Sequence, residues 1–270
     1  MKAQKILFIT SEMAPFVPDS RNATMGRYMP QQIQELGHEI RTFTPKWGNI
    51  NERRNQLHEV IRLSGMNLII DDTDHPLIIK VASLQAAHMQ IYFIDNDDYF
   101  MKRLINADES GKEYEDNGER AIFYARGVLE TVKKLRWVPD VIHCHGWITA
   151  LAPLYIKKAY KDEPSFCDAK VVFSVSAPDL KSDLGEKALR CIPFRGATLE
   201  DVKDICQEQF THRELMKIGA RFSDGIILDS EGVDPSVVEF AKAEGTAVLE
   251  CQGEDYGEAY SKFYDSLLDC

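Results

Sequence analysis

Short β-branched runs alternate with longer helical patterns along most of this chain. Apolar strand candidates lie at 5–10, 39–44, 77–81, 89–94, 140–144, 170–175, 225–228 and 246–249. Several are apolar on both faces, as strands buried between two helical layers must be. Helical patterns occupy 26–36, 118–135, 148–160, 213–221, 234–243 and 257–268. This alternation predicts an α/β fold with a single doubly wound, mostly parallel, Rossmann-like sheet.

Two segments depart from the alternation. Residues 77–94 contain two strands without a helix between them, which predicts an antiparallel hairpin with its turn at 83–88. Residues 177–207 are charged and weakly periodic, which indicates an irregular loop with short helices. We expect one domain over 1–245. Residues 246–270 should add a strand and a returning helix, packed on the same domain through a stripe at Tyr260, Tyr264 and Leu268.

Composition excludes several classes of protein. The 270 residues contain 43 acidic and 32 basic side chains, for a formal net charge of −11. Such a surface repels phosphate backbones and anionic lipid, so we expect neither nucleic acid nor membrane as a partner. The apolar stretch 6–10 is too short for a signal sequence, and no run reaches the roughly 18 apolar residues of a membrane span. Six cysteines without a CxxC pair indicate reduced thiols, and hence a cytoplasmic location.

Ligands of doubly wound sheets bind at the carboxyl ends of the strands. The first strand runs into Ser11 and Glu12, followed by a loop with no glycine before Gly26. Pro18 in this loop has no N–H to donate, so a backbone cradle for phosphate is disfavoured. Arg21 is either a cation for a ligand or a solvated surface charge.

The strand that ends near Cys144 carries His143 and His145 on one side. His145 could face a ligand and hydrogen-bond a sugar hydroxyl, with Trp147 as a stacking or packing wall. The alternative is a pair of satisfied, half-buried histidines. A metal is disfavoured because Cys144 points the other way and no third ligand is evident.

Asp116 and Asn117 precede the long helical pattern at 118–135. Either side chain could cap the helix, and Glu119 would interact favourably with the helix dipole. A ligand contact by Asp116 or Asn117 is the competing interpretation. No GxSxG, Walker or HExxH motif is present, and no cofactor or metal is expected. The residues alone therefore indicate where a pocket lies without naming a reaction.

An ordered series of segments resembles bacterial glycogen synthases and plant starch synthases. Residues 5–17 (KILFITSEMAPFV), 36–40 (LGHEI) and 45–48 (PKWG) resemble the start of these enzymes. The Asp116-Asn117-x-x-Arg120 motif, residues 137–153 and residues 214–224 match later parts of the family in the same order. The match extends over about the first 240 residues and is far more specific than one short motif.

The resemblance implies the N-terminal half of a glycosyltransferase-B fold. Enzymes of this family transfer glucose from ADP-glucose or UDP-glucose to an α-1,4-glucan, in a cleft between two Rossmann-like domains. The N-terminal domain mainly carries the acceptor side. By resemblance, the acceptor-binding residues of this chain are Glu12, Asp116, Asn117, His145 and Trp147.

The chain departs from the family in several motifs. Where the family has Lys-Thr/Val-Gly-Gly-Leu-Gly/Ala-Asp, residues 18–24 begin Pro18-Asp19-Ser20-Arg21, so the phosphate-contacting lysine and both glycines are replaced. The His-Asp-Trp motif has become His145-Gly146-Trp147, and Thr-Ile-His-Asn has become residues 174–177, SVSA. Only 38 residues follow Gly232 where the family has a second domain, although 256–268 resemble the family's closing helix.

These departures predict a degenerate member of the family that is inactive as a transferase on its own. We expect an accessory module of glycogen metabolism that keeps an α-glucan site. The alternative is a protein-docking scaffold or regulatory subunit without sugar binding, whose partner covers the exposed cleft face. If the cleft face is apolar and aromatic, the interpretation that a partner protein covers it is favoured. If the face is polar and charged, the chain is better interpreted as an adapted monomer.

Overall fold

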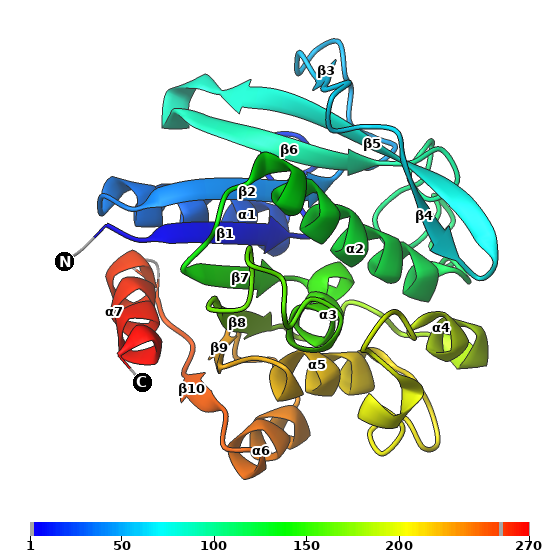
Figure 1. The fold of residues 1–270 in the computed structure, drawn as a ribbon, viewed down its shortest axis with the longest axis vertical. Helices are drawn as coiled ribbons and strands as arrows, with labels where there is room; N and C mark the ends of the chain where they lie inside the picture. Colours follow the sequence, from blue (N-terminus) through cyan, green and yellow to red (C-terminus); the bar gives the residue numbers. More distant parts are fainter. Residues whose placement is uncertain (1–2, 254–255, 270) are drawn as a thin grey trace.

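Figure 1 shows a computed structural model of the chain, which describes residues 3–253 and 256–269. Its strands are β1 (Lys5–Thr10), β2 (Glu39–Pro45), β3 (His58–Glu59), β4 (Met66–Ile70), β5 (Thr73–Leu84), β6 (Met89–Asp95), β7 (Val141–His145), β8 (Lys170–Val175), β9 (Gly225–Leu228) and β10 (Ala247–Leu249). Its α-helices are α1 (Arg21–Glu35), α2 (Asn117–Leu135), α3 (Ala152–Lys158), α4 (Gly185–Cys191), α5 (His212–Arg221), α6 (Pro235–Ala243) and α7 (Tyr256–Leu268).

The strands form a single sheet in the order β10-β9-β8-β7-β1-β2-β6-β5-β3, with β4 paired to β5. Neighbouring strands from β10 to β6 are parallel, and β5 runs antiparallel to β6. The predicted α/β class, the mostly parallel sheet and the hairpin are therefore confirmed. The order changes direction at β1, because β2 lies on one side of it and β7 on the other. Such a switch point opens a crevice at the carboxyl ends of the strands.

Helices cover both faces of this sheet, and both faces of β1 are accordingly apolar. Ile6 and Phe8 belong to the cluster that α1 and α7 cover, whereas Leu7 and Ile9 belong to the larger cluster beneath α2, α3 and α5. All four side chains are fully buried. Side chains of a strand alternate between faces, so a central strand between two helical layers must be apolar throughout.

Helix α7 packs beside α1 on the second face (Figure 1). Its Tyr260 and Tyr264 are buried, and Leu268 is half-buried. The Tyr264 hydroxyl lies 2.6 Å from Nδ1 of His143, whose Nε2 lies 2.7 Å from the Ser174 hydroxyl. His143 is therefore one of the satisfied, buried histidines that the sequence allowed. Burial, reinforced by nearby His145, holds the pKa of His143 well below its usual range.

This burial predicts a specific loss of stability in acid. The folded-state pKa of His143 lies below its unfolded-state value of about 6.5. The unfolded chain therefore binds the proton first, and stability falls as the pH drops below about 6.5, by about 1.4 kcal/mol per pH unit. Urea titrations between pH 7 and pH 5 should show a shallower decline for His143→Gln than for the wild type. The exposed-site control His58→Gln should follow the wild type, and a slope that His143→Gln leaves unchanged would contradict this assignment.

Three local expectations need correction. Helix α1 begins at Arg21 rather than residue 26, because the Ser20 hydroxyl accepts the Ala23 N–H at 2.9 Å and caps the helix. The segment 18–25 is thus mostly helix and not a loop. Strands β3 and β4 were not predicted, and β5 is longer than expected, from Thr73 to Leu84. Within 177–207, the expected short helices include α4.

No helix in the described ranges combines the length and the apolar character that a membrane crossing requires.

Candidate functional site

The switch point between β1 and β7 brings several buried polar groups together. Ser11 and Glu12 follow β1, and the Ser11 N–H donates to the His145 carbonyl at 2.9 Å. Glu12 is 5% exposed and His145 is fully buried. Asp229, which directly follows β9, is 2% exposed. The carboxyl ends of three parallel strands thus supply a histidine and two carboxylates to one edge of the sheet.

His145 lies beside Asp229 without a well-formed hydrogen bond. Its Nε2 is 3.4 Å from Asp229 Oδ2, a separation longer than an ordinary hydrogen bond. Nδ1 of His145 and the buried hydroxyl oxygens of Ser11 and Ser230 also lack partners in the described part of the chain. Buried polar atoms are normally satisfied, so this group of unsatisfied atoms marks the switch point as a candidate ligand site.

Two carboxylates, Glu12 again and Asp179, lie against the N-terminus of α1. Glu12 accepts a hydrogen bond from the Ser20 hydroxyl at 2.7 Å, and Asp179 accepts one from Asn22 Nδ2 at 3.2 Å. Burial raises the pKa of Glu12, although Ser20 and Asn22 oppose the shift. Negative charge is favourable at a helix N-terminus. This chain therefore has two carboxylates at the N-terminus of α1, next to the segment that the resemblance aligns with the family's glycine loop.

Asp179 also interacts with His212 at the start of α5. Burial raises the pKa of Asp179, and the repulsion from Asp229 acts in the same direction. Burial lowers the pKa of His212 although Asp179 attracts its proton. Both groups are thus shifted toward their neutral forms, which reduces the charge that the site must solvate.

Sequence reasoning missed Asn22, Asp179, His212 and Asp229 as members of this site. Asp229 could have been found, because it directly follows a buried strand, as Glu12 does. Asp179 and His212 could not, because Asp179 lies in the weakly periodic segment 177–207 and His212 lies between that segment and the helical pattern predicted at 213–221.

Trp147 lies in the core rather than at a surface. It is 1% exposed, and its indole nitrogen has no hydrogen-bond partner in the described structure. The packing role that the sequence allowed is the one observed. A sugar could stack on this ring only if the core moved.

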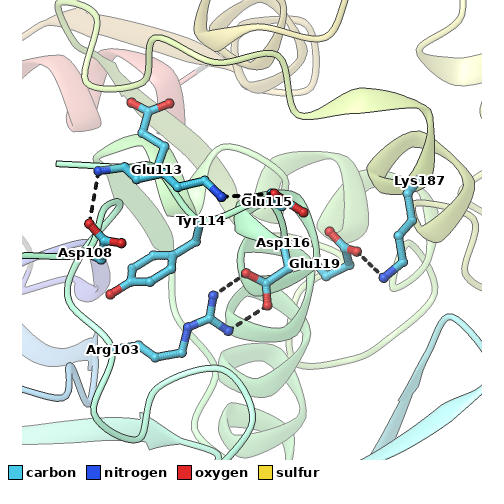
Figure 2. Close-up of a pocket in the computed structure, with 9 residues that line it drawn as sticks. Arg103, Asp108, Glu113, Tyr114, Glu115, Asp116, Glu119 and Lys187 are labelled. Carbon is cyan, nitrogen blue, oxygen red and sulfur yellow. Dashed lines mark hydrogen bonds and ion pairs between the residues drawn. The ribbon is translucent and has the colours of Figure 1, made fainter. Parts of the chain in front are cut away.

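Asp116 lines a separate cavity of about 450 Å³ near the start of α2, shown in Figure 2. Its carboxylate accepts two hydrogen bonds from the Arg103 guanidinium, one of them at 2.7 Å. Beside it, Glu119 faces Lys187, with 2.9 Å between Oε1 and Nζ. These charges are largely neutralised within the cavity. The structure does not place Asp116 in hydrogen-bond contact with His145.

The capping role expected of Asp116 or Asn117 is not observed. Asp116 is the N-cap residue of α2, but its side chain accepts no helix amide, because Arg103 engages both oxygens. Asn117 instead accepts a hydrogen bond from Arg120 at 2.8 Å and donates one to the Asn106 carbonyl at 2.8 Å. The Asn117 amide is buried and structural.

Within residues 3–253 and 256–269, no three His, Cys, Asp or Glu side chains converge in a way that could hold a metal ion.

The fold and the switch-point site define a doubly wound α/β domain of the kind that forms half of a glycosyltransferase-B enzyme. Residues 5–248 match the model of the starch synthase catalytic domain. The chain therefore belongs to the starch synthase catalytic domain family, as the resemblance indicated.

Relatives and solved structures agree with this assignment. The chain is 39% identical over 172 residues to a glycogen synthase from Chlorobium limicola and 38% identical to one from Chlorobaculum tepidum. These matches cover 63% of this chain and 35% of each relative, so the chain spans about a third of their length. The catalytic domain of starch synthase IV from Arabidopsis thaliana, solved bound to ADP and acarbose, shares the fold with a TM-score of 0.75 at 15% identity. That likeness covers 94% of this chain and 52% of the plant chain.

Proposed function

We propose that this chain binds α-1,4-glucan in a groove at the carboxyl edge of the sheet and does not bind a sugar nucleotide there. The groove has a volume of about 1100 Å³ and lies between the N-terminal half of α1, the residues after β9 and the start of α7. Ser230 in the groove wall directly follows Asp229, whose Oδ2 lies 3.4 Å from Nε2 of His145.

The mixture of aromatic and acidic side chains in this groove carries the proposal. Three tyrosines line it: Tyr28 is 42% exposed and presents its ring to a ligand, whereas Tyr256 and Tyr260 are 7% and 2% exposed and form the buried wall. Tyrosine rings offer apolar faces for the carbon skeleton of a sugar while their hydroxyls can hydrogen-bond. Asp19 and Glu231 add carboxylates that accept hydrogen bonds from hydroxyl groups. A neutral, hydroxyl-rich chain fits this lining.

The charge of the groove argues against a nucleotide diphosphate. Arg21 is the one cationic side chain among the described residues that line it, against Asp19 and Glu231. Glu12 and Asp179 add carboxylates near the N-terminus of α1. Glucosyl transfer needs groups that stabilise the charge on the leaving diphosphate. We therefore propose a non-catalytic role as an accessory, glucan-binding module of glycogen metabolism.

Co-sedimentation with glycogen tests the proposal. The wild type should pellet with glycogen, and Tyr28→Ala should weaken binding by about tenfold through loss of a stacking face. Glu231→Gln should weaken binding less, because an amide still hydrogen-bonds hydroxyls. Met101→Ala, a truncation at a residue that is 50% exposed outside the groove, is the matched control and should bind as the wild type does. Absence of wild-type binding would refute the glucan role and favour the protein-docking alternative.

A further inference from the structure

A second groove lies away from the switch point and is lined by β4, the middle of α2 and the segment after α4. Figure 1 labels β4, α2 and α4. Its volume is about 930 Å³, within the usual range for sites that bind small molecules. Its apolar wall includes Ile69, Pro193 and Phe194, and three arginines also line it: Arg126, Arg190 and Arg195. None of these three arginines lines the proposed glucan groove.

Arg126 is buried without an ionic partner. It is 5% exposed, and its Nη1 donates to the Ile69 carbonyl at 2.7 Å. Its guanidinium carbon lies 3.7 Å from the centre of the Phe194 ring. Nε is buried without a hydrogen-bond acceptor, and no carboxylate of the described chain lies within 4.0 Å of the guanidinium. A guanidinium has five N–H donors, so most of the hydrogen-bonding capacity of Arg126 is unused.

Arg120, six residues earlier on α2, shows what a purely structural buried arginine looks like in this protein. Arg120 is fully buried, and its guanidinium donates to three backbone carbonyls and to Asn117, at 2.7 to 3.0 Å. Burying a charge is costly unless its donors are satisfied. Arg126 lacks this compensation, which indicates that a ligand supplies it.

Nearby carboxylates do not neutralise Arg126, because they are already engaged. Glu130 accepts a hydrogen bond from the Tyr160 hydroxyl at 2.7 Å and pairs with Arg195 at 3.2 Å. Asp71, at the rim, lies 3.4 Å from Lys187. After these pairings, Arg126 and Arg190 face the groove with Asp72 as the unpaired carboxylate among the described lining residues.

We propose that this groove binds a small organic anion, with a phosphate or carboxylate group at Arg126 and Arg190 and an apolar part against Phe194 and Ile69. Charge-assisted hydrogen bonds from arginine to either group are strong and directional. The apolar wall favours an anion with a hydrophobic or aromatic portion over the bare ion.

Calorimetric titration of the full chain with phenyl phosphate, benzoate and inorganic phosphate tests this proposal. Phenyl phosphate or benzoate should bind with a stoichiometry of one, more tightly than inorganic phosphate, and the stronger of the two identifies the head group. Arg126→Met should weaken binding at least tenfold, as expected for loss of a hydrogen bond to a charged group. The exposed-site control Arg62→Met should bind as the wild type does.

Two outcomes would overturn the proposal: no binding of either organic anion at millimolar concentration, or equal binding by wild type and Arg126→Met. Should Arg126→Met fail to fold, Arg190→Gln provides the same test on an exposed side chain. Weakened binding by that variant supports the site, and unchanged binding refutes it. Glycogen co-sedimentation of either folded variant should match the wild type, because the two grooves are distinct.

Discussion

Replacing Gly146 with aspartate, which restores the family's His-Asp-Trp motif, should destabilise this protein by about 3–5 kcal/mol. Gly146 has φ of 91° and ψ of 157°, a region of backbone conformation that is almost exclusive to glycine. A Cβ at this position would also lie 2.1 Å from the Ser11 hydroxyl oxygen and 2.5 Å from its Cβ. Both the backbone strain and the clash make aspartate unfavourable at position 146. Urea denaturation measures the loss.

Gly245→Asp is the matched control for this substitution. Gly245 has φ of 79°, but a Cβ there would meet no atom within 4 Å, so this variant carries backbone strain without the clash. It should lose about 1–2 kcal/mol. Ser11→Gly in the Gly146→Asp background should recover part of the lost stability by removing the clash. A Gly146→Asp variant as stable as the wild type would show that the switch point is not built around a glycine.

Replacement of Arg120 with methionine should lower the free energy of unfolding by about 3–5 kcal/mol. Arg120 is the side chain that joins the N-terminus of α2 to the segment before it. Its guanidinium donates to the carbonyls of Tyr99, Leu104 and Ile105. Methionine has a similar length but no donor, so these carbonyls would lose their partner. Each buried acceptor left unpaired costs about 1–3 kcal/mol.

The control for Arg120 is Arg54→Met, which removes the same group from an exposed position. Surface substitutions of this kind usually change stability by less than about 0.5 kcal/mol. Urea denaturation of both variants gives the comparison. If Arg120→Met and Arg54→Met unfold at the same urea concentration, the hydrogen bonds from Arg120 to the three backbone carbonyls contribute nothing to stability.

The central strands could be predicted because the apolar run that forms each of them is visible in a few consecutive residues. Residues 5–10 and 170–175 are continuous apolar runs, and burial on both faces leaves such runs few alternatives to a central strand. Strand β4 was missed because its burial alternates over five residues, a pattern too short to distinguish from a loop. The start of α1 was missed because residues 21–25 show no apolar stripe that would predict a helix. The hydrogen bond from the Ala23 N–H to the Ser20 side chain nevertheless starts the helix there.

The site was only partly predictable, since it is assembled from distant segments. His145 and Glu12 could be found because each lies at the end of an apolar strand. The approach of His145 to Asp229 brings together residues that are 84 positions apart in the sequence, and no spacing rule connects them. Trp147 was a candidate for sugar stacking because tryptophan suits that role. Its burial depends on the packing of α2 and α5, which the sequence pattern does not reveal.

Calorimetric titration of the wild type with maltoheptaose and, separately, with ADP-glucose tests the central proposal most directly. The groove of tyrosines and carboxylates predicts that maltoheptaose binds and that ADP-glucose does not, at the same protein concentration and ionic strength. Weakening by Tyr28→Ala should accompany the binding of maltoheptaose. Binding of ADP-glucose without maltoheptaose would contradict the proposal and indicate that the nucleotide site is retained despite the replaced loop at 18–21.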